Sequence, residues 1–369
     1  MPYPERKQLY AQIEDFRERR LISFFTSLRP AATGSMASDS ISEFIKQLNE
    51  IPADETKIDL LIVSLGGDPM VSWRIISMLR ERFKTVGVLL PFAAFSAATL
   101  LALGADEIIM HPFSNLGPVD PQLSYERRIP GQPNQTERVN FGTEDLRYFM
   151  DYMRQDVGIT DQEQMERAFE LVCKDIGAIQ IGAAKRSSYL ALSLGEKLLS
   201  LHMKDQNKVK AIAEALNKSF YHHGYPLGRD EAKKIGLQVK EPPEELEKLM
   251  WKVWEDIETD MKCDKPFNQL DIILSDPKAV NLLAPVPQIQ IPANLPKDVR
   301  DQIIQHLLQQ INLIYIEPIE YKLCYAAVES TRCRSTFEST NKILACRMPD
   351  MNIAYNDLRI SSGYSFYKE

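Results

Sequence analysis

The sequence has few of the features that mark membrane, secreted or metal-binding proteins. Its 369 residues contain no apolar run of about 18 residues, and the N-terminal segment is charged where a signal peptide would be apolar. The five cysteines are odd in number and never spaced as CxxC, which predicts reduced thiols and neither a disulfide framework nor a zinc site. We therefore expect a soluble, cytoplasmic protein that needs no metal or other cofactor.

An excess of basic residues is also missing. The 44 Lys and Arg residues are outnumbered by 51 Asp and Glu residues, so the formal net charge is −7. Because binding to nucleic acid depends on a basic surface, nucleic acid is excluded as the main ligand. The phosphate-binding loops GxxxxGK[ST] and GxGxxG do not occur either. With 44% hydrophobic residues, the chain can bury an ordinary globular core.

Strands and helices are expected to alternate over the segment that follows residue 57. Apolar runs at 58–65, 85–92 and 106–112 have strand length and suit a parallel sheet that is buried on both faces. Between them, 69–83 has the period of an amphipathic helix and 96–105 is a short helix of small residues. This order predicts a right-handed βαβαβ unit of the α/β class.

The rest of the chain is expected to add helices and then an appendage. Residues 113–143 are rich in proline and glycine and predict a long loop, whereas 144–220 has a helical pattern throughout. The composition shifts toward proline near 264–297, which predicts a boundary. We expect a catalytic domain over 1–264 and a small α+β appendage over 265–369, an accessory region used to select a partner or substrate.

Two motifs follow neighbouring predicted strands. SLGGDP (64–69) places paired glycines after the first strand, and FSAATL (95–100) places Ser96 at the start of a helix. Each motif also has a simpler interpretation: SLGGDP as an ordinary strand-to-helix turn, and Ser96 as a helix N-cap. If both motifs act together, the amides of Gly67 and Ala97 are positioned to stabilise an oxyanion beside a nucleophilic hydroxyl.

The candidates for a base and its acidic partner lie further along the chain. Two of the five histidines, His222 and His223, are adjacent, so at most one is expected to serve a site. Asp120 lies in LGPVDPQ, between two prolines. The alternatives are a surface-loop histidine and an ordinary turn aspartate.

These motifs taken together resemble the serine dehydrogenase proteinase family, a branch of the ClpP/crotonase superfamily that is related to signal peptide peptidase A. The resemblance is carried by IDLLIVSLGGDPMVSWRIISMLRERF, FAAFSAATLLALGADEIIMHPFSNLGPVDPQL and HHGYPLGRDEAKKIGLQV, and it covers about residues 20–262. It implies a ClpP/crotonase-like core, a parallel-sheet βαβ spiral with helical additions.

The resemblance also implies a serine peptidase with Ser96, Asp120 and His223 as its triad. Gly67 and Ala97 would then form the oxyanion hole, and Lys185 or His222 is the alternative base. The expected substrate is a peptide or an unfolded protein, and a homo-oligomer without a membrane span is the expected assembly. The rival hypotheses are a catalytically inactive ClpP-like scaffold or interaction protein and a crotonase-like acyl-transfer enzyme.

Overall fold

The computed structural model describes residues 3–129, 131–218, 220, 222–283, 291–292, 294–310, 314–348 and 352–368. Within these ranges, a nine-stranded sheet runs in the order β10-β12-β11-β1-β2-β3-β5-β9, with β13 paired to β12. Five neighbouring strands are parallel to one another: β1 (Arg20–Thr26), β2 (Lys57–Val63), β3 (Thr85–Leu90), β5 (Glu107–Met110) and β9 (Val239–Lys240). The predicted α/β class and the parallel βαβαβ unit are confirmed.

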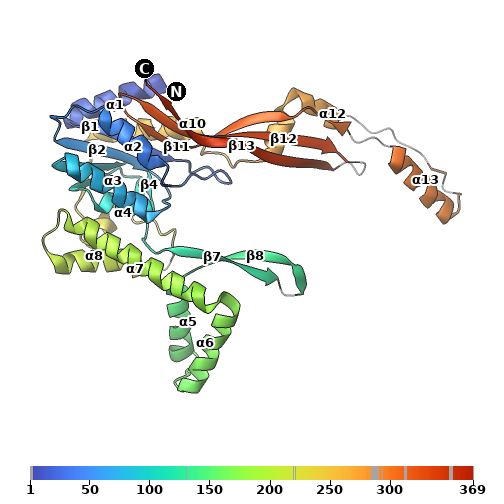
Figure 1. The fold of residues 1–369 in the computed structure, drawn as a ribbon, viewed down its shortest axis with the longest axis horizontal. Coiled ribbons are helices and arrows are strands. Elements are labelled where there is room, and N and C mark those ends of the chain that lie inside the picture. The colour runs from blue at the N-terminus through green and yellow to red at the C-terminus, as the bar shows by residue number, and fades with distance from the viewer. Residues whose placement is uncertain are drawn as a thin grey trace.

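Helices cover both faces of the parallel strands, as Figure 1 shows. Alternate strand residues explain this, because Ile22 and Phe24 pack on one face while Leu21 and Phe25 pack on the other. One face is covered by α2 (Ser40–Asn49), α3 (Pro69–Arg82), α4 (Ala97–Leu103), α7 (Ala178–Ser200) and α8 (Gln206–Lys218). The other is covered by α1 (Tyr3–Arg17) and α10 (Glu244–Met261).

The segment that the sequence predicts as a long loop contains a β-hairpin. After β4 (Ala93–Ala94) and β6 (Asn115–Leu116) form a small parallel pair, β7 (Gln122–Ile129) and β8 (Gln132–Gly142) pair with each other and project from the core (Figure 1). Cross-strand polar contacts hold the hairpin, among them the Arg127–Glu137 ion pair at 2.7 Å. The apolar alternation that marks a strand in sequence is therefore weak here.

The helices predicted between 144 and 220 are confirmed in the described residues. They are α5 (Thr143–Gln155), α6 (Gln162–Ile176), α7 and α8, followed by the short α9 (Arg229–Lys234). In Figure 1, α5 and α6 extend away from the sheet beyond one end of α7.

Residues beyond 264 extend the central sheet. Here β11 (Ile319–Glu329) pairs antiparallel with β1, and β12 (Arg334–Arg347) and β13 (Ile353–Tyr367) continue outward as a long arm (Figure 1). The remaining elements are α11 (Gln269–Ser275), the 3-10 turn η1 (Pro277–Ala279), α12 (Val280–Leu283), α13 (Lys297–Gln310) and β10 (Ile314–Tyr315). The division at residue 264 stays a prediction, and the two parts on either side of it share one sheet.

A buried ion pair links the two ends of the chain. Arg6 of α1 is fully buried and donates from Nε and Nη2 to the two carboxylate oxygens of Glu329, each at 2.8 Å. Asp256 of α10 accepts a further hydrogen bond from Arg6, and Tyr10 donates to Glu329 at 2.7 Å. Burial alone would raise the pKa of Glu329, but Arg6 outweighs it and holds that pKa below the ordinary value.

We predict that Glu329→Gln lowers the free energy of unfolding by roughly 3–5 kcal/mol, because breaking a buried pair leaves a charge poorly compensated. The control is Glu320→Gln on the same strand, whose exposed pair with Lys342 is worth about 0–1 kcal/mol. Urea denaturation of the full chain measures both. Equal decreases in the free energy of unfolding in the two variants would contradict the larger contribution that we assign to the buried pair.

Candidate active site

Two glycines let the chain turn sharply at the end of β2. Gly66 has φ +102° and Gly67 has φ +151°, a region that other residues rarely adopt. A Cβ on Gly66 would lie 2.7 Å from the Phe95 carbonyl oxygen and 2.9 Å from Cβ of Ser96. The turn therefore packs directly against the backbone that carries Ser96.

The segment before α2 fixes the direction of the Gly67 amide. Met36 donates its N–H to the Gly66 carbonyl at 2.8 Å and accepts from the N–H of Asp68 at 2.9 Å. This pattern is a parallel bridge, in which the N–H and C=O of Gly67 itself point away from Met36. The Gly67 amide donates to none of the described residues.

Ser96 holds an unusual backbone conformation at the start of α4. Its φ of +52° and ψ of −115° lie outside the regions that L-residues ordinarily occupy, at a cost of about 1–3 kcal/mol. Its side chain makes no capping hydrogen bond, so the simpler reading of Ser96 as an N-cap does not describe it. The amide of Ala97, the first residue of α4, also donates to none of the described residues.

Three buried hydroxyls hold the backbone around Ser96. Ser64 accepts hydrogen bonds from Thr26 and from the amide of Gly66, while its own backbone bonds to Ala93 and Phe95. Ser72 of α3 donates to the Ala97 carbonyl at 2.5 Å.

The third hydroxyl, Thr99, bonds to the carbonyls of Ala94 and Gly117 at 2.8 and 2.9 Å. The glycine turn, the Ser96 backbone and the segment that leads to Asp120 are thus fastened together.

Asp120 and His223 meet although 103 residues separate them in sequence. Reciprocal backbone hydrogen bonds between Leu116 and Leu227 bring their segments side by side. Asp120 Oδ1 then lies 2.7 Å from His223 Nδ1. The Asp120 side chain is 12% exposed and that of His223 is 40% exposed. Their hydrogen bond raises the pKa of His223 above its ordinary 6.5, more than burial lowers it.

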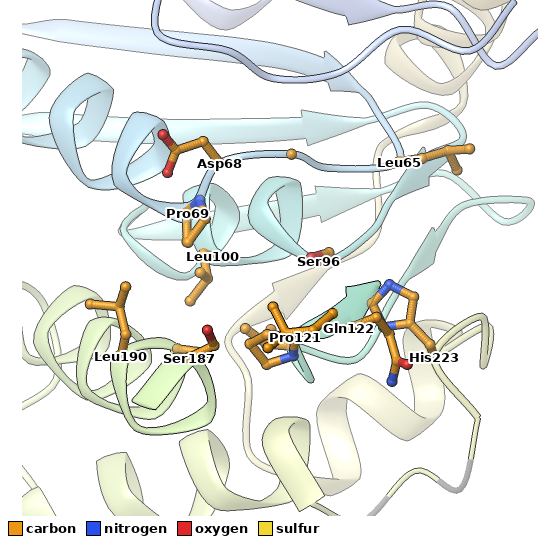
Figure 2. A pocket seen from close by; sticks show the side chains of 14 residues that line it. Leu65, Asp68, Pro69, Ser96, Leu100, Pro121, Gln122, Ser187, Leu190 and His223 are labelled. Carbon is orange, nitrogen blue, oxygen red and sulfur yellow. The ribbon is translucent and has the colours of Figure 1, made fainter. Parts of the chain in front are cut away.

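One cavity of about 440 Å³ joins these groups. Gly67, Ser96 and His223 line it, and Figure 2 shows Ser96 and His223 on its wall together with Pro121 and Gln122 from the segment after Asp120. Much of the remaining wall is apolar: Leu65, Pro69, Leu100, Val119, Leu123, Leu190 and Ala191. Among the described residues, no hydrogen bond joins Ser96 to His223.

The alternative bases lie outside this wall. The exposed His222 accepts the N–H of Gly224 at Nδ1, and Lys185 on α7 is exposed with its Nζ 4.7 Å from the centre of the Tyr189 ring. Neither lines the cavity. In the part of the chain that the structure describes, no cluster of His, Cys, Asp and Glu could hold a metal ion.

Sequence reasoning missed the contribution of α7 to the cavity. Ser187, Leu190 and Ala191 form part of its wall, as the labels of Ser187 and Leu190 in Figure 2 show. The helical pattern of α7 predicts an apolar face, and the resemblance brings this helix toward Ser96 only through Lys185 as an alternative base, not through the three residues that line the cavity.

The central segment is similar to a known family of proteinases. Residues 35–130 match the ClpP-like SDH-type serine proteinases. The resemblance predicted from the sequence is thereby confirmed, over a segment that contains Gly67, Ser96 and Asp120 and ends before His223. This match supports peptidase activity at the level of the family, and only for the matched segment.

Two uncharacterized proteins of Methanocaldococcus jannaschii, MJ0137 and MJ1495, are each 29% identical to the chain, over 213 and 198 residues. The matches cover 56% and 54% of this chain, and 62% and 57% of the two relatives. The chain thus spans about 60% of the length of these curated relatives.

Two solved structures are similar to this chain at lower sequence identity. A mutant of a membrane-bound stomatin-specific protease is 16% identical, with a TM-score of 0.36, over 59% of this chain and 80% of that one. ClpP1 from Listeria monocytogenes is 14% identical, with a TM-score of 0.32, over 63% and 98%. Within the described residues of our chain, no helix combines the length and the apolar character needed to cross a membrane.

We predict that Gly66→Ala destabilises the fold by about 1–3 kcal/mol more than Gly158→Ala does. Both glycines have positive φ, +102° and +79°, so both variants bear the conformational cost. Only at Gly66 would the new Cβ meet neighbouring backbone, since nothing lies within 4 Å at Gly158. Thermal unfolding of the two variants compares them, and a similar loss in both would refute the close packing of the turn against Ser96.

Proposed function

We propose that this chain is a serine peptidase in which Ser96 is the nucleophile, His223 the general base and Asp120 the group that orients the histidine. The observation that carries the proposal is the shared cavity, which Gly67, Ser96 and His223 line. Asp120 bonds to His223 from behind this wall, and the amides of Gly67 and Ala97 donate to none of the described residues. These are the parts that acyl transfer through a serine requires.

Asp120 assigns the roles of the two imidazole nitrogens. When Nδ1–H donates to the Asp120 carboxylate, Nε2 carries the free lone pair and serves as the base. His223 then takes the Ser96 proton as Oγ bonds to the peptide carbonyl carbon, and it returns that proton to the leaving amine when the C–N bond breaks. A water molecule activated in the same way hydrolyses the acyl-enzyme and restores the serine.

The amides of Gly67 and Ala97 are the donors for the tetrahedral oxyanion. Loss of one such donor typically costs about 3 kcal/mol of transition-state stabilisation. The hydrogen bonds of Ser64, Ser72 and Met36 fix the backbone that carries these amides, so their directions are set before substrate binds. Such preorganisation is what makes backbone donors effective.

The cavity favours an extended peptide. The outward C=O of Gly67 offers a strand-like hydrogen bond to a peptide backbone while its N–H serves the oxyanion, and the apolar wall accepts a hydrophobic side chain. A peptide or an unfolded protein segment therefore fits better than a folded substrate, whose backbone groups are already paired.

Assembly into a homo-oligomer and use of the C-terminal region by a protein partner are part of the same proposal. Exposed apolar side chains on α6 and α7 support the first, with Leu171 66% and Ile179 84% exposed. The long outward arm of β12 and β13 supports the second.

A fluorophosphonate probe is expected to label wild-type protein at Ser96. We predict that Ser96→Ala abolishes labelling and lowers peptide hydrolysis by at least about a thousandfold. Ser187→Ala, which alters a hydroxyl in the same cavity, is the matched control and is expected to label normally. Mass spectrometry locates the adduct. An unlabelled wild-type protein would favour the inactive scaffold or the acyl-transfer enzyme.

The rate of hydrolysis is expected to rise with pH through a midpoint above 6.5. His223 accepts a proton only when neutral, and its raised pKa keeps it protonated to a higher pH than an ordinary histidine. Asp120→Asn removes the carboxylate that raises the pKa and leaves the burial that lowers it, so the midpoint should fall to 6.5 or below while kcat drops by about 10³–10⁴.

The control for this pH profile is Asp68→Asn. Asp68 lines the cavity, but its carboxylate accepts the N–H of Met70 and forms no hydrogen bond or ion pair with His223. A midpoint that stays in place in Asp120→Asn, or moves equally in Asp68→Asn, would show that another group is the base.

A further inference from the structure

A second cavity, of about 250 Å³, lies where the loop before α2 meets the C-terminal strands. Three aromatic rings line it, one from each of β11, β12 and β13: Tyr325, Phe337 and Tyr364. The Phe337 and Tyr364 ring centres are 5.2 Å apart at 70°, and those of Tyr325 and Phe337 are 6.4 Å apart at 67°. These edge-to-face contacts make an apolar wall that is already packed.

Two charged groups accompany the rings. The Arg359 guanidinium lies 5.7 Å from the centre of the Tyr325 ring and its Nη2 donates to the Tyr325 hydroxyl at 3.4 Å, but it forms no ion pair with any described residue. Asp39, on the loop, precedes α2 without capping it and has no ion-pair partner in the described ranges. A guanidinium beside aromatic rings that has no ion-pair partner among the described residues suits a carboxylate that is attached to an apolar group.

We propose that this cavity binds the C-terminal residue of a peptide when that residue is apolar or aromatic. The terminal carboxylate pairs with Arg359, the side chain packs on the rings, and Asp39 accepts an N–H of the ligand. The cavity volume suits one large side chain, so recognition is confined to the last residue.

The loop that forms one side of this cavity also supports the glycine turn of the candidate active site. The backbone N–H of Gly34 donates to the Ser27 carbonyl, and the N–H of Ser27 donates to the Tyr325 carbonyl, each at 2.8 Å. Further along the same loop, the backbone of Met36 bonds to Gly66 and Asp68. There is no room between the loop and the strand, since a Cβ on Gly34 would lie 1.9 Å from the Tyr325 oxygen.

A ligand that touches both the loop and the rings restrains this loop, and through it the Gly67 amide. The expected consequence is faster hydrolysis when the second cavity is filled, which rests on the proposed function. Since peptide cleavage creates new C-terminal carboxylates, the products are themselves ligands of the required chemistry.

Calorimetry on full-length protein with Ser96→Ala tests binding without cleavage. The probe is an acetylated tripeptide that ends in phenylalanine, compared with its C-terminal amide and with free phenylalanine. We expect the acid to bind at least about tenfold more tightly than the amide. Binding of free phenylalanine as tight as that of the tripeptide would show that the natural ligand includes single amino acids, with Asp39 pairing the ammonium.

Two variants in the Ser96→Ala background locate the site. In Arg359→Gln, the acid and the amide should bind equally, because the group that distinguishes them is gone. Lys322→Gln, an exposed lysine on β11 outside the cavity, should keep the preference for the acid. No binding at concentrations on the order of 1 mM, or a preference that survives in Arg359→Gln, would overturn the proposal.

The effect on catalysis is measured separately, with Ser96 intact and a fluorogenic peptide as substrate. A rate increase of about fivefold with the acid tripeptide, absent in Arg359→Gln, is the expected result. If binding occurs and the rate does not change, the coupling through the loop is wrong. If the protein does not hydrolyse any peptide, the calorimetric result still decides whether the site exists.

Discussion

The contact between the glycine turn and the Ser96 backbone is the constraint on which the rest of the candidate site depends. Gly66 and Ser96 approach so closely that no side chain fits between them, and Ser64 bonds to both sides of the contact. Because these bonds are buried, they are not exchanged for bonds to water, and the geometry is maintained without substrate. The Asp120–His223 pair is attached to the same core by the Leu116–Leu227 bridge.

The central sheet gives this constraint its rigidity. The turn after β2 and the backbone near Ser96 lie at the carboxyl ends of neighbouring parallel strands, where α/β proteins usually place their sites. On the far side of β1 the sheet continues into β11, held by the Arg6–Glu329 pair. The C-terminal strands are therefore continuous, through backbone hydrogen bonds, with the strands that carry the site.

The parts that could be predicted from the sequence are the local ones. A buried strand followed by glycines, and a serine that opens a small-residue helix, are patterns of a few residues each, and both motifs lie where they were expected. The partnership of Asp120 and His223 rested on family resemblance alone, because nothing local links residues 103 positions apart. The β7–β8 hairpin was missed since its polar pairs hide the strand period. The pairing of β1 with β11 depends on contacts across some 300 residues, such as Ser23 with Glu329, that no local pattern encodes.

Under the proposed function, the conformation of Ser96 places stability and activity in opposition at one position. A glycine there would adopt φ +52° without strain and would make the fold more stable, but it would remove the hydroxyl that we propose as the nucleophile. The chain has a serine at a position where the backbone conformation is strained for any residue with a Cβ. A laboratory variant selected for thermal stability alone, without the proposed activity, is therefore expected to accept glycine at residue 96.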